Sequence, residues 1–262
     1  MRRPAFHLGS AFLAALFVLP ILWSGWSSVR PGSGFSLDSY RRLATYGEGV
    51  GVYLTNTVLL VVLTVTGTVA VSTLAGYAFS RFAFPGRRIL FGLILAILMV
   101  PYPTILIPLY VLLGKLGLQD SLVGLALVMI MFQLPFAVFM MRNSFAAVPR
   151  ALDDAALIDG CGSFGVLMRV LLPAVAPGLV TVGLFAFLAS WNDYVAPLIL
   201  ISSDERFPLP VAIVNMRLHD FGAVDYPTMQ AGVMFMAAPC LALFLVLQRF
   251  YVRGFMSGAL RG

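Results

Sequence analysis

Six long apolar stretches constrain the fold of this chain more than any other feature. A bilayer core of about 30 Å is crossed by about 20 residues of α-helix. The stretches that reach this length lie near residues 8–28, 52–80, 89–113, 121–141, 175–201 and 230–250. A backbone exposed to lipid must satisfy its own hydrogen bonds, so each stretch is predicted to be helical. The sequence therefore predicts an all-α integral membrane protein with about six transmembrane helices.

The composition agrees, because the chain has too few charges for a surface that faces water. Of its 262 residues, 60% are hydrophobic and 11% are charged, whereas a soluble domain carries roughly 25% charged residues. Ionisable residues are scarce within the spans, with Asp193 as the main candidate. This scarcity argues against a carrier driven by ions or protons, which usually holds such groups inside the membrane.

The motifs of several kinds of site are missing. A P-loop holds phosphates with backbone amides and the lysine of Gly-Lys-Ser/Thr, but the only lysine, Lys115, is followed by leucine. ATP is therefore not expected on this chain. Cys161 and Cys240 lie in no CxxC or HExxH spacing and are predicted to be unpaired thiols. We expect no catalytic residue, metal or other cofactor, and no nucleic-acid partner.

The first stretch and the basic residues bear on topology. Arg2, Arg3 and the apolar run after them could form a signal peptide, but the run continues to Trp26 without a clear cleavage site, which favours an uncleaved helix. A cytoplasmic N-terminus places most of the 17 basic residues on the cytoplasmic side. The positive-inside rule then predicts that both termini are cytoplasmic.

Two stretches carry features of helix packing. In the second, Thr64, Thr68, Ser72, Gly76 and Ser80 are four residues apart and share one side of a helix. Small residues let helix backbones approach closely in lipid, so we expect this stripe to be a packing face. The third stretch contains three prolines, which predict a kinked helix; they are Pro101, Pro103 and Pro108.

A polar segment, 143–173, separates the fourth and fifth stretches and reads as helix, turn, helix. Pro149 suits the first turn of a helix, and Asp153 and Asp154 place negative charge near its positive end. Gly160 suits a left-handed stop. Ser163 is predicted to cap a second short helix. The unit is either a docking element for a partner or an interfacial hairpin that binds lipid headgroups.

The same segment resembles the EAA loop of ATP-binding-cassette importer permeases. The family pattern is Glu-Ala-Ala, three residues, Gly, nine residues, an aliphatic residue, one residue, Leu-Pro. The matching residues, at the same spacing, are Asp154-Ala155-Ala156, Gly160, Val170 and Leu172-Pro173. The sequence departs from the pattern twice, with Asp154 in place of glutamate and Cys161 in place of the usual alanine.

Nearly the whole chain resembles the shorter permease of the maltose-type importers, carbohydrate uptake transporter family 1. The further matches, in chain order, are Asn56-Thr57, 78–82, Pro101, Trp191-Asn192-Asp193, 208–210 and the tail 258–262. The resemblance implies a type I importer permease with one transmembrane domain over residues 1–262. Residues 1–50 would form its first helix and outer loop, and 51–262 its core with the loop 143–173.

The resemblance also implies partners and a location. Such a permease pairs with a second permease, two ATPase subunits that hold ATP and Mg, and an external solute-binding protein, in a prokaryotic cytoplasmic membrane. It moves a sugar or oligosaccharide and is not itself an enzyme. The implied ATPase contacts are Asp154, Ala155, Ala156, Leu157, Asp159, Gly160, Cys161 and Pro173. The tail residues implied to reach the ATPases are Gly258, Ala259, Leu260, Arg261 and Gly262.

The substrate path and the rival functions stay open from sequence. Trp191, Asn192, Asp193 and Tyr194 are candidates, because aromatic faces pack on sugar rings and amides bond hydroxyls; plain helix packing is the alternative. The charged loop 202–229 would either touch the binding protein or be solvated. An importer for another solute, an ion-coupled secondary carrier and a membrane enzyme are the remaining alternatives.

Overall fold

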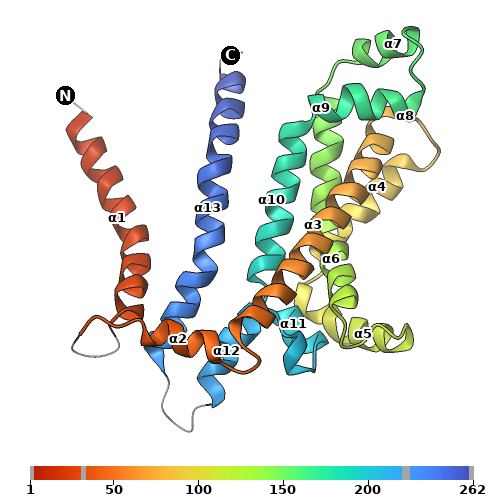
Figure 1. The fold of residues 1–262 in the computed structure, drawn as a ribbon. Coiled ribbons are helices and arrows are strands. Elements are labelled where there is room, and N and C mark those ends of the chain that lie inside the picture. Colours follow the sequence, from red (N-terminus) through yellow and green to blue (C-terminus); the bar gives the residue numbers. More distant parts are fainter. Residues whose placement is uncertain (1–2, 31–33, 220–224, 260–262) are drawn as a thin grey trace. The chain divides into compact units, whose positions relative to one another are not determined.

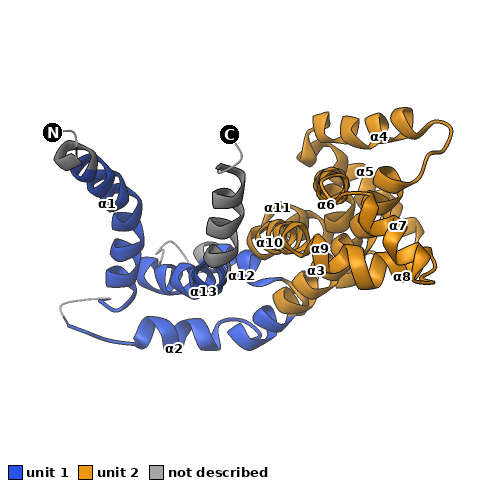
Figure 2. Cartoon of the chain, turned by 90° about the horizontal axis from the view of Figure 1, so that it is seen from above, with its two compact units in different colours: residues 1–55, 208–249 blue, residues 56–207, 250–262 orange. Residues whose placement is uncertain are grey.

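The computed structural model describes residues 3–30, 34–219 and 225–259. Throughout these ranges the regular structure is helical, without a strand (Figure 1). The chain divides into two compact units (Figure 2). Unit 1 holds residues 1–55 and 208–249, and unit 2 holds residues 56–207 and 250–262. The single permease domain stays a prediction.

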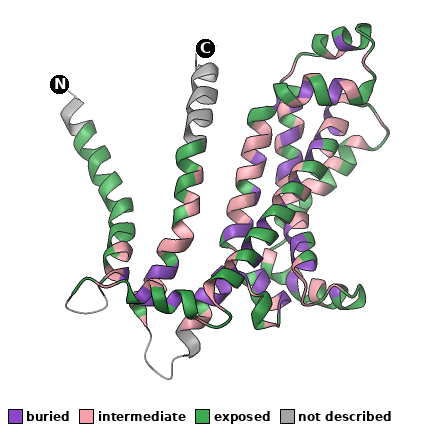
Figure 3. Ribbon diagram, in the orientation of Figure 1, coloured by how far each residue is buried: buried purple, intermediate pink, exposed green. Residues whose placement is uncertain are grey.

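Unit 1 contains α1 (Arg3–Ser28), α2 (Asp38–Thr45), α12 (Leu209–His219) and most of α13 (Tyr226–Ala259). Polar contacts join α2 to the start of α13: Arg42 Nε lies 3.1 Å from Asp225 Oδ2 and donates to Thr228 Oγ1 at 3.2 Å. The apolar side chains along α1 are exposed (Figure 3). A helix with an exposed apolar surface is stable when lipid surrounds it, which fits the predicted first span.

Unit 2 is built on α3 (Val50–Arg81), α6 (Leu122–Ala146) and α10 (Ala176–Asn192). Residues 50–55 of α3 belong to unit 1. Its other elements are α4 (Arg87–Ala96), η1 (Ile97–Met99), α5 (Tyr102–Lys115), α7 (Ala151–Ile158), α8 (Ser163–Gly165), η2 (Val166–Leu171), α9 (Leu172–Ala174), α11 (Val195–Leu200) and η3 (Asp204–Arg206). The helices α6 and α10 pack along each other, and their buried residues form much of the core.

The predicted packing stripe of α3 is confirmed. Thr64, Thr68, Ser72, Gly76 and Ser80 are all buried. At Gly76, an added β-carbon would lie 2.6 Å from Met141 Cβ and 2.8 Å from the Arg142 nitrogen. Glycine therefore permits α3 and α6 to cross at backbone contact, as expected for small residues in membrane helices.

The described helices offer four to six candidate spans against the six predicted, and two of the predicted spans are not continuous. Four described helices are long and apolar enough to cross a membrane, or up to six if each bent pair forms one span. The predicted span 89–113 is broken: 87–99 and 102–115 meet at 104°. Proline disfavours the helical region for the residue before it, so Val100, which precedes Pro101, is extended. The predicted span 175–201 likewise ends at Asn192, after which α11 begins.

Candidate functional site

The polar segment between α6 and α10 forms the predicted helix, turn and helix. The first helix, α7, starts at Ala151, and Arg150 is its N-cap. Pro149 therefore lies just before the helix and not in its first turn. Asp153 and Asp154 are in the first turn, as predicted. Negative charge at this end is stabilised by the helix dipole.

The turn after α7 is closed by a glycine in the left-handed conformation. Gly160 has φ of +84°. Its N–H donates to the Leu157 carbonyl at 3.1 Å, and the Cys161 N–H donates to the Ala156 carbonyl at 3.0 Å. These two bonds are those of a Schellman motif, which satisfies the last carbonyls of a helix and sets the exit direction of the chain.

The second helix starts differently from the sequence prediction. Ser163 is the first residue of α8, its N-cap is Gly162, and no side chain caps it, so the predicted Ser163 cap is wrong. The chain continues through the wide π-helical turn η2 into α9. The wide turn ends two residues before Pro173. Proline has no N–H to donate, and its ring clashes with the carbonyl four residues earlier.

The implied ATPase contacts separate into an exposed and a buried group. Asp154, Ala155, Leu157, Asp159, Gly160 and Pro173 are exposed. Ala156 is only 6% exposed and lies in a core cluster with Phe145 and Leu171, and Cys161 packs against the same cluster. Ala156 anchors the segment from inside and offers no open surface, whereas Cys161 is half-buried.

Two exposed residues of the segment were not singled out from sequence. Ile158 is 86% exposed and Phe164 is 67% exposed. Large apolar side chains that are exposed close together mark an interaction surface. Their signal was available in the sequence as large hydrophobic residues on either side of the Gly160 turn.

A second candidate site is a cavity of about 450 Å³ in unit 2. Its lining comes from η1, α5, α6 and α10 and combines apolar residues with four polar ones. The polar residues are Tyr102, Gln133, Asn192 and Asp193. Its size and the mixture of apolar and polar groups suit a small polar molecule with an apolar face.

Polar contacts hold the C-terminal end of α10 in place. The Tyr102 hydroxyl donates to Asp193 Oδ2. The other oxygen of Asp193 accepts the Val195 N–H at 2.9 Å. Asn192 Nδ2 donates to the Leu188 carbonyl at 2.8 Å. Asp193 thus joins the start of α5 to the start of α11.

The four predicted path residues have different surroundings. Asn192 and Asp193 line the cavity. Trp191 is 3% exposed and stacks on Phe187, with ring centroids 5.5 Å apart. Tyr194 is half-buried and is not among the residues that line the cavity. Gln133 and Tyr102, which come from other helices, were missed because only the fold brings them beside Asn192.

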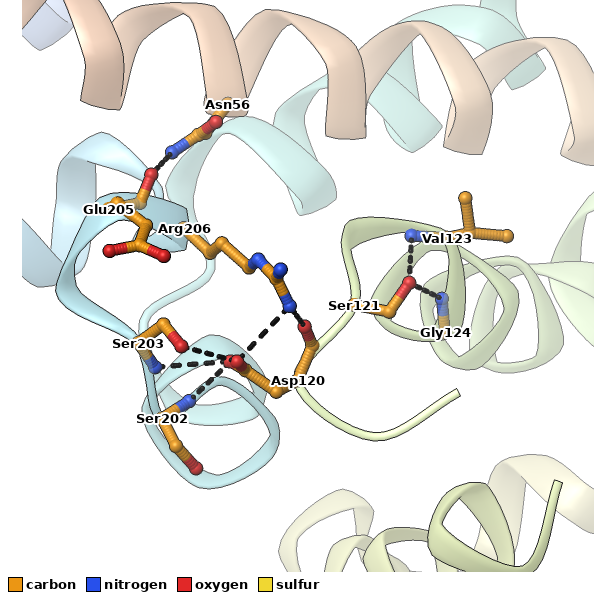
Figure 4. Close-up of polar contacts among 9 residues, drawn as sticks. All are labelled: Asn56, Asp120, Ser121, Val123, Gly124, Ser202, Ser203, Glu205 and Arg206. Atoms are coloured by element: carbon orange, nitrogen blue, oxygen red, sulfur yellow. Dashed lines mark hydrogen bonds and ion pairs between the residues drawn. The ribbon is translucent and has the colours of Figure 1, made fainter. Parts of the chain in front are cut away.

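A polar network also joins distant loops of unit 2 (Figure 4). Asp120 accepts the N–H groups of Ser202 and Ser203 at 2.8 and 3.1 Å. Arg206 Nη1 lies 3.2 Å from Asp120 Oδ2, and the Ser203 hydroxyl donates to the same oxygen. The Ser203 hydrogen bond is the main cause that holds the pKa of Asp120 below its usual value.

The same network includes Asn56 and a strained backbone. Asn56 Nδ2 donates to the Glu205 carbonyl at 2.8 Å (Figure 4). It also donates to the Phe207 carbonyl at 3.1 Å. Asp120 has φ of +50°, an uncommon conformation for a residue other than glycine. The ordered loop 202–207 therefore rests on contacts with α3 and with the turn before α6.

Two other predictions concern the tail and metals. Gly258 and Ala259 belong to the end of α13, while Leu260, Arg261 and Gly262 lie outside the described residues. Within the described part of the chain, no group of three or more His, Cys, Asp or Glu residues could hold a metal ion.

Comparison with known proteins identifies relatives along most of the chain. The family model described as binding-protein-dependent transport system inner membrane component matches residues 68–256. The probable ABC transporter permease YurM of Bacillus subtilis is 34% identical over 84% of this chain and 73% of its own length. The arabinooligosaccharides transport system permease AraQ of the same organism is 31% identical, over 99% and 96%.

Further similarities extend the set. The trehalose transport system permease SugB of Mycobacterium tuberculosis is 31% identical over 97% of this chain and 94% of its own length. A crystal structure of a bacterial ABC transporter involved in the import of the acidic polysaccharide alginate matches 95% of this chain and 97% of the compared chain. The TM-score is 0.81 at 22% identity, which supports the fold.

Proposed function

Because the chain belongs to the family of binding-protein-dependent transport system inner membrane components, we propose that it is a permease subunit of an ATP-driven sugar importer. The sugar or oligosaccharide would be delivered by a solute-binding protein. Relatives named for arabinooligosaccharide, galactooligosaccharide and trehalose transport support this substrate class. The chain works with a second permease, and two ATPase subunits would bind ATP and Mg and hydrolyse the ATP.

The observation that carries the proposal is the exposed surface around Gly160. Asp154, Ala155, Leu157 and Asp159 lie on it with Ile158. Alanine lets a partner approach closely, while the exposed Leu157 and Ile158 supply apolar area to bury. The Schellman turn holds the angle between the two helices, so a push on this surface would move α10. We assign the surface to ATPase docking, and Gly258 to Gly262 to a second contact with the ATPases.

The membrane placement follows from the charges. The family is one of inner membrane components, and the described helices make this a multi-pass membrane protein. We place it in a prokaryotic cytoplasmic membrane with both termini in the cytoplasm, because this puts most of the 17 basic residues on the cytoplasmic side. Both units would then belong to one permease domain.

The cavity beside Asn192 is our candidate for the substrate path. Asn192 and Gln133 offer amide groups to sugar hydroxyls, and Phe132 offers a ring that can pack on the sugar face. The lining contains one carboxylate, Asp193, and no basic residue. A cavity with this charge favours neutral sugars over sugar acids.

The test is reconstitution of the complete importer. The tagged chain, isolated in mild detergent from its native host, is expected to carry an ATPase and a second permease. In proteoliposomes with ATP and the binding protein, it should import radiolabelled trehalose, arabinotriose or galactobiose. Recovery of an intact chain alone, with uptake that follows an ion gradient and ignores ATP, would contradict the proposal and favour a secondary carrier.

A further inference from the structure

The last residue of α3 is paired with the first turn of α7. Arg81 Nε lies 2.8 Å from Asp153 Oδ2, and the two side chains are 7% and 18% exposed. Arg81 Nη2 also donates to the Val148 carbonyl at 3.0 Å, just before α7. A buried charge without a partner is strongly destabilising, so these two residues depend on each other.

A second contact joins α3 to the other half of the same segment. The Tyr77 hydroxyl, one helical turn before Arg81, donates to the Ser163 carbonyl at 3.2 Å, where α8 begins. The Tyr77 ring also lies 5.7 Å from the Phe145 ring, centroid to centroid. The end of α3 therefore contacts both helices of the loop that carries the exposed surface.

These contacts matter because α3 has no short covalent route to that loop. Residues 143–173 continue directly from α6 and lead directly into α10, so a shift of α7 reaches those helices along the chain. In sequence, α3 ends about 70 residues before α7, and α4, η1, α5 and α6 intervene. Besides the crossing of α3 and α6 at Gly76, the contacts that join α7 and α8 to α3 are these side-chain contacts.

The pair is also incompletely satisfied in this arrangement. Asp153 Oδ1 is buried and has no hydrogen-bond partner among the described residues. Arg81 Nε approaches Asp153 without the alignment of a hydrogen bond. A buried ion pair adds static stability only when its remaining polar atoms are satisfied. The spare acceptor on Asp153 is consistent with a contact that rearranges between two positions of α7.

We propose that Arg81 is a positioning residue that makes α3 follow α7 when an ATPase moves the exposed surface. The inference rests on the proposed function, since it assumes that α7 is the element that is pushed. Arg81 would act after docking, because its side chain is buried behind α7 and is not part of the exposed surface. Its loss should therefore separate ATP hydrolysis from uptake while the complex stays assembled.

The experiment uses the assembled importer in proteoliposomes with its binding protein. Arg81→Gln, Asp153→Asn and the reciprocal pair Arg81→Asp with Asp153→Arg are compared with wild type. Only complexes that elute intact with their ATPases are assayed, so a loss of folding lowers yield and not the measured ratio. The readout is uptake of radiolabelled trehalose, arabinotriose or galactobiose, whichever wild type imports, divided by ATP hydrolysed.

The single variants are expected to keep ATP hydrolysis and to lose uptake per ATP by roughly tenfold, within the range of coupling between distant sites. The reciprocal pair should recover part of that ratio. Arg42→Gln is the matched control, because it removes an arginine–aspartate pair of similar length, 3.1 Å, in unit 1. Its ratio should equal that of wild type.

Two results would overturn the inference. An unchanged ratio in both single variants would show that α3 does not depend on this pair for coupling. Loss of the ATPases from otherwise folded variant complexes would make Arg81 a docking residue. Either result leaves the proposed function standing if wild type imports sugar with ATP; a wild type without ATP-dependent uptake would instead remove the premise.

Discussion

Gly160 shows how one backbone angle can decide the geometry of a docking surface. An added β-carbon at Gly160 would meet no atom within 4 Å, so space does not select glycine there. Glycine is selected there by the left-handed φ of +84°. In that conformation a residue with a β-carbon costs about 1–2 kcal/mol, and asparagine tolerates it best. Conformation can thus be tested separately from side-chain volume.

Gly160→Val is therefore expected to lower sugar uptake far more than Gly160→Asn, with both proteins reaching the membrane. A β-branched residue is a severe outlier at positive φ, and the altered turn would tilt α7 away from its partner. Gly162→Val is the control, because Gly162 also has open space but φ of −74°. Equal uptake by the two Gly160 variants would show that the left-handed turn is not required.

Asp120 makes a prediction about pH. Its pKa is lowered in the folded protein, from a starting value of 3.8, chiefly by the Ser203 hydrogen bond. A lowered folded pKa means that the ionised form is stabilising above pH 3.8 and that this stability is lost as the pH falls through the folded pKa. Thermal unfolding in detergent should therefore show a loss of stability below about pH 4.

The variant Asp120→Asn should lack that acid-dependent step and be less stable at pH 7 by about 1.5–3 kcal/mol, the usual contribution of a hydrogen bond to a charged group. Asp204→Asn, on the same loop and exposed, is the control and should keep the wild-type profile. If Asp120→Asn still loses stability below about pH 4, another carboxylate causes that loss.

Among the elements, α3 agrees best with its sequence, and the broken helices agree least. The four-residue spacing of threonine, serine and glycine was sufficient to identify the buried face of α3, since a helix repeats every 3.6 residues. Hydropathy alone could not separate one straight span from two helices that meet at 104°, because both have the same composition. Pro101 indicated a kink but not its angle.

The α3–α6 crossing gives the prediction at this scale. Gly76→Leu would place a β-carbon 2.8 Å from the Arg142 backbone nitrogen, so the two helices must separate. We expect a loss of about 1–3 kcal/mol, as for other overpacked cores, measured as the fraction of protein that remains folded after heating in detergent. Gly92→Leu, where a β-carbon meets nothing within 4 Å, should unfold like wild type.

For the molecule as a whole, the sequence predicted the fold class and the family, and the structure added the composition of the cavity. Local patterns are sufficient for spans and for the EAA-like spacing, because both are read within about 30 residues. Gln133 and Tyr102 could not be assigned to the Asn192 site, since they come from helices that only tertiary packing brings there. Asp120 was missed for the same reason.

The substrate path is tested on the complete importer. Asn192→Ala and Gln133→Ala should each lower uptake of the imported sugar several-fold while ATP hydrolysis stimulated by the binding protein continues, because each removes about one neutral hydrogen bond. Thr181→Ala is the control on α10, since Thr181 is half-buried, does not line the cavity and bonds the Pro177 carbonyl of its own helix. Unchanged uptake in both variants would place the path elsewhere.

The two helix breaks lie side by side, at Pro101 and at Asp193, and the Tyr102 hydroxyl joins them. A wall made of continuous helices can open only by tilting whole rods or by unwinding a turn, and unwinding exposes backbone groups to lipid at a cost of several kcal/mol each. Here the wall already has a seam. Parting it breaks the Tyr102–Asp193 hydrogen bond and separates the apolar side chains of α5 and α11, such as Leu106 and Leu200, but it leaves the helical turns on either side intact.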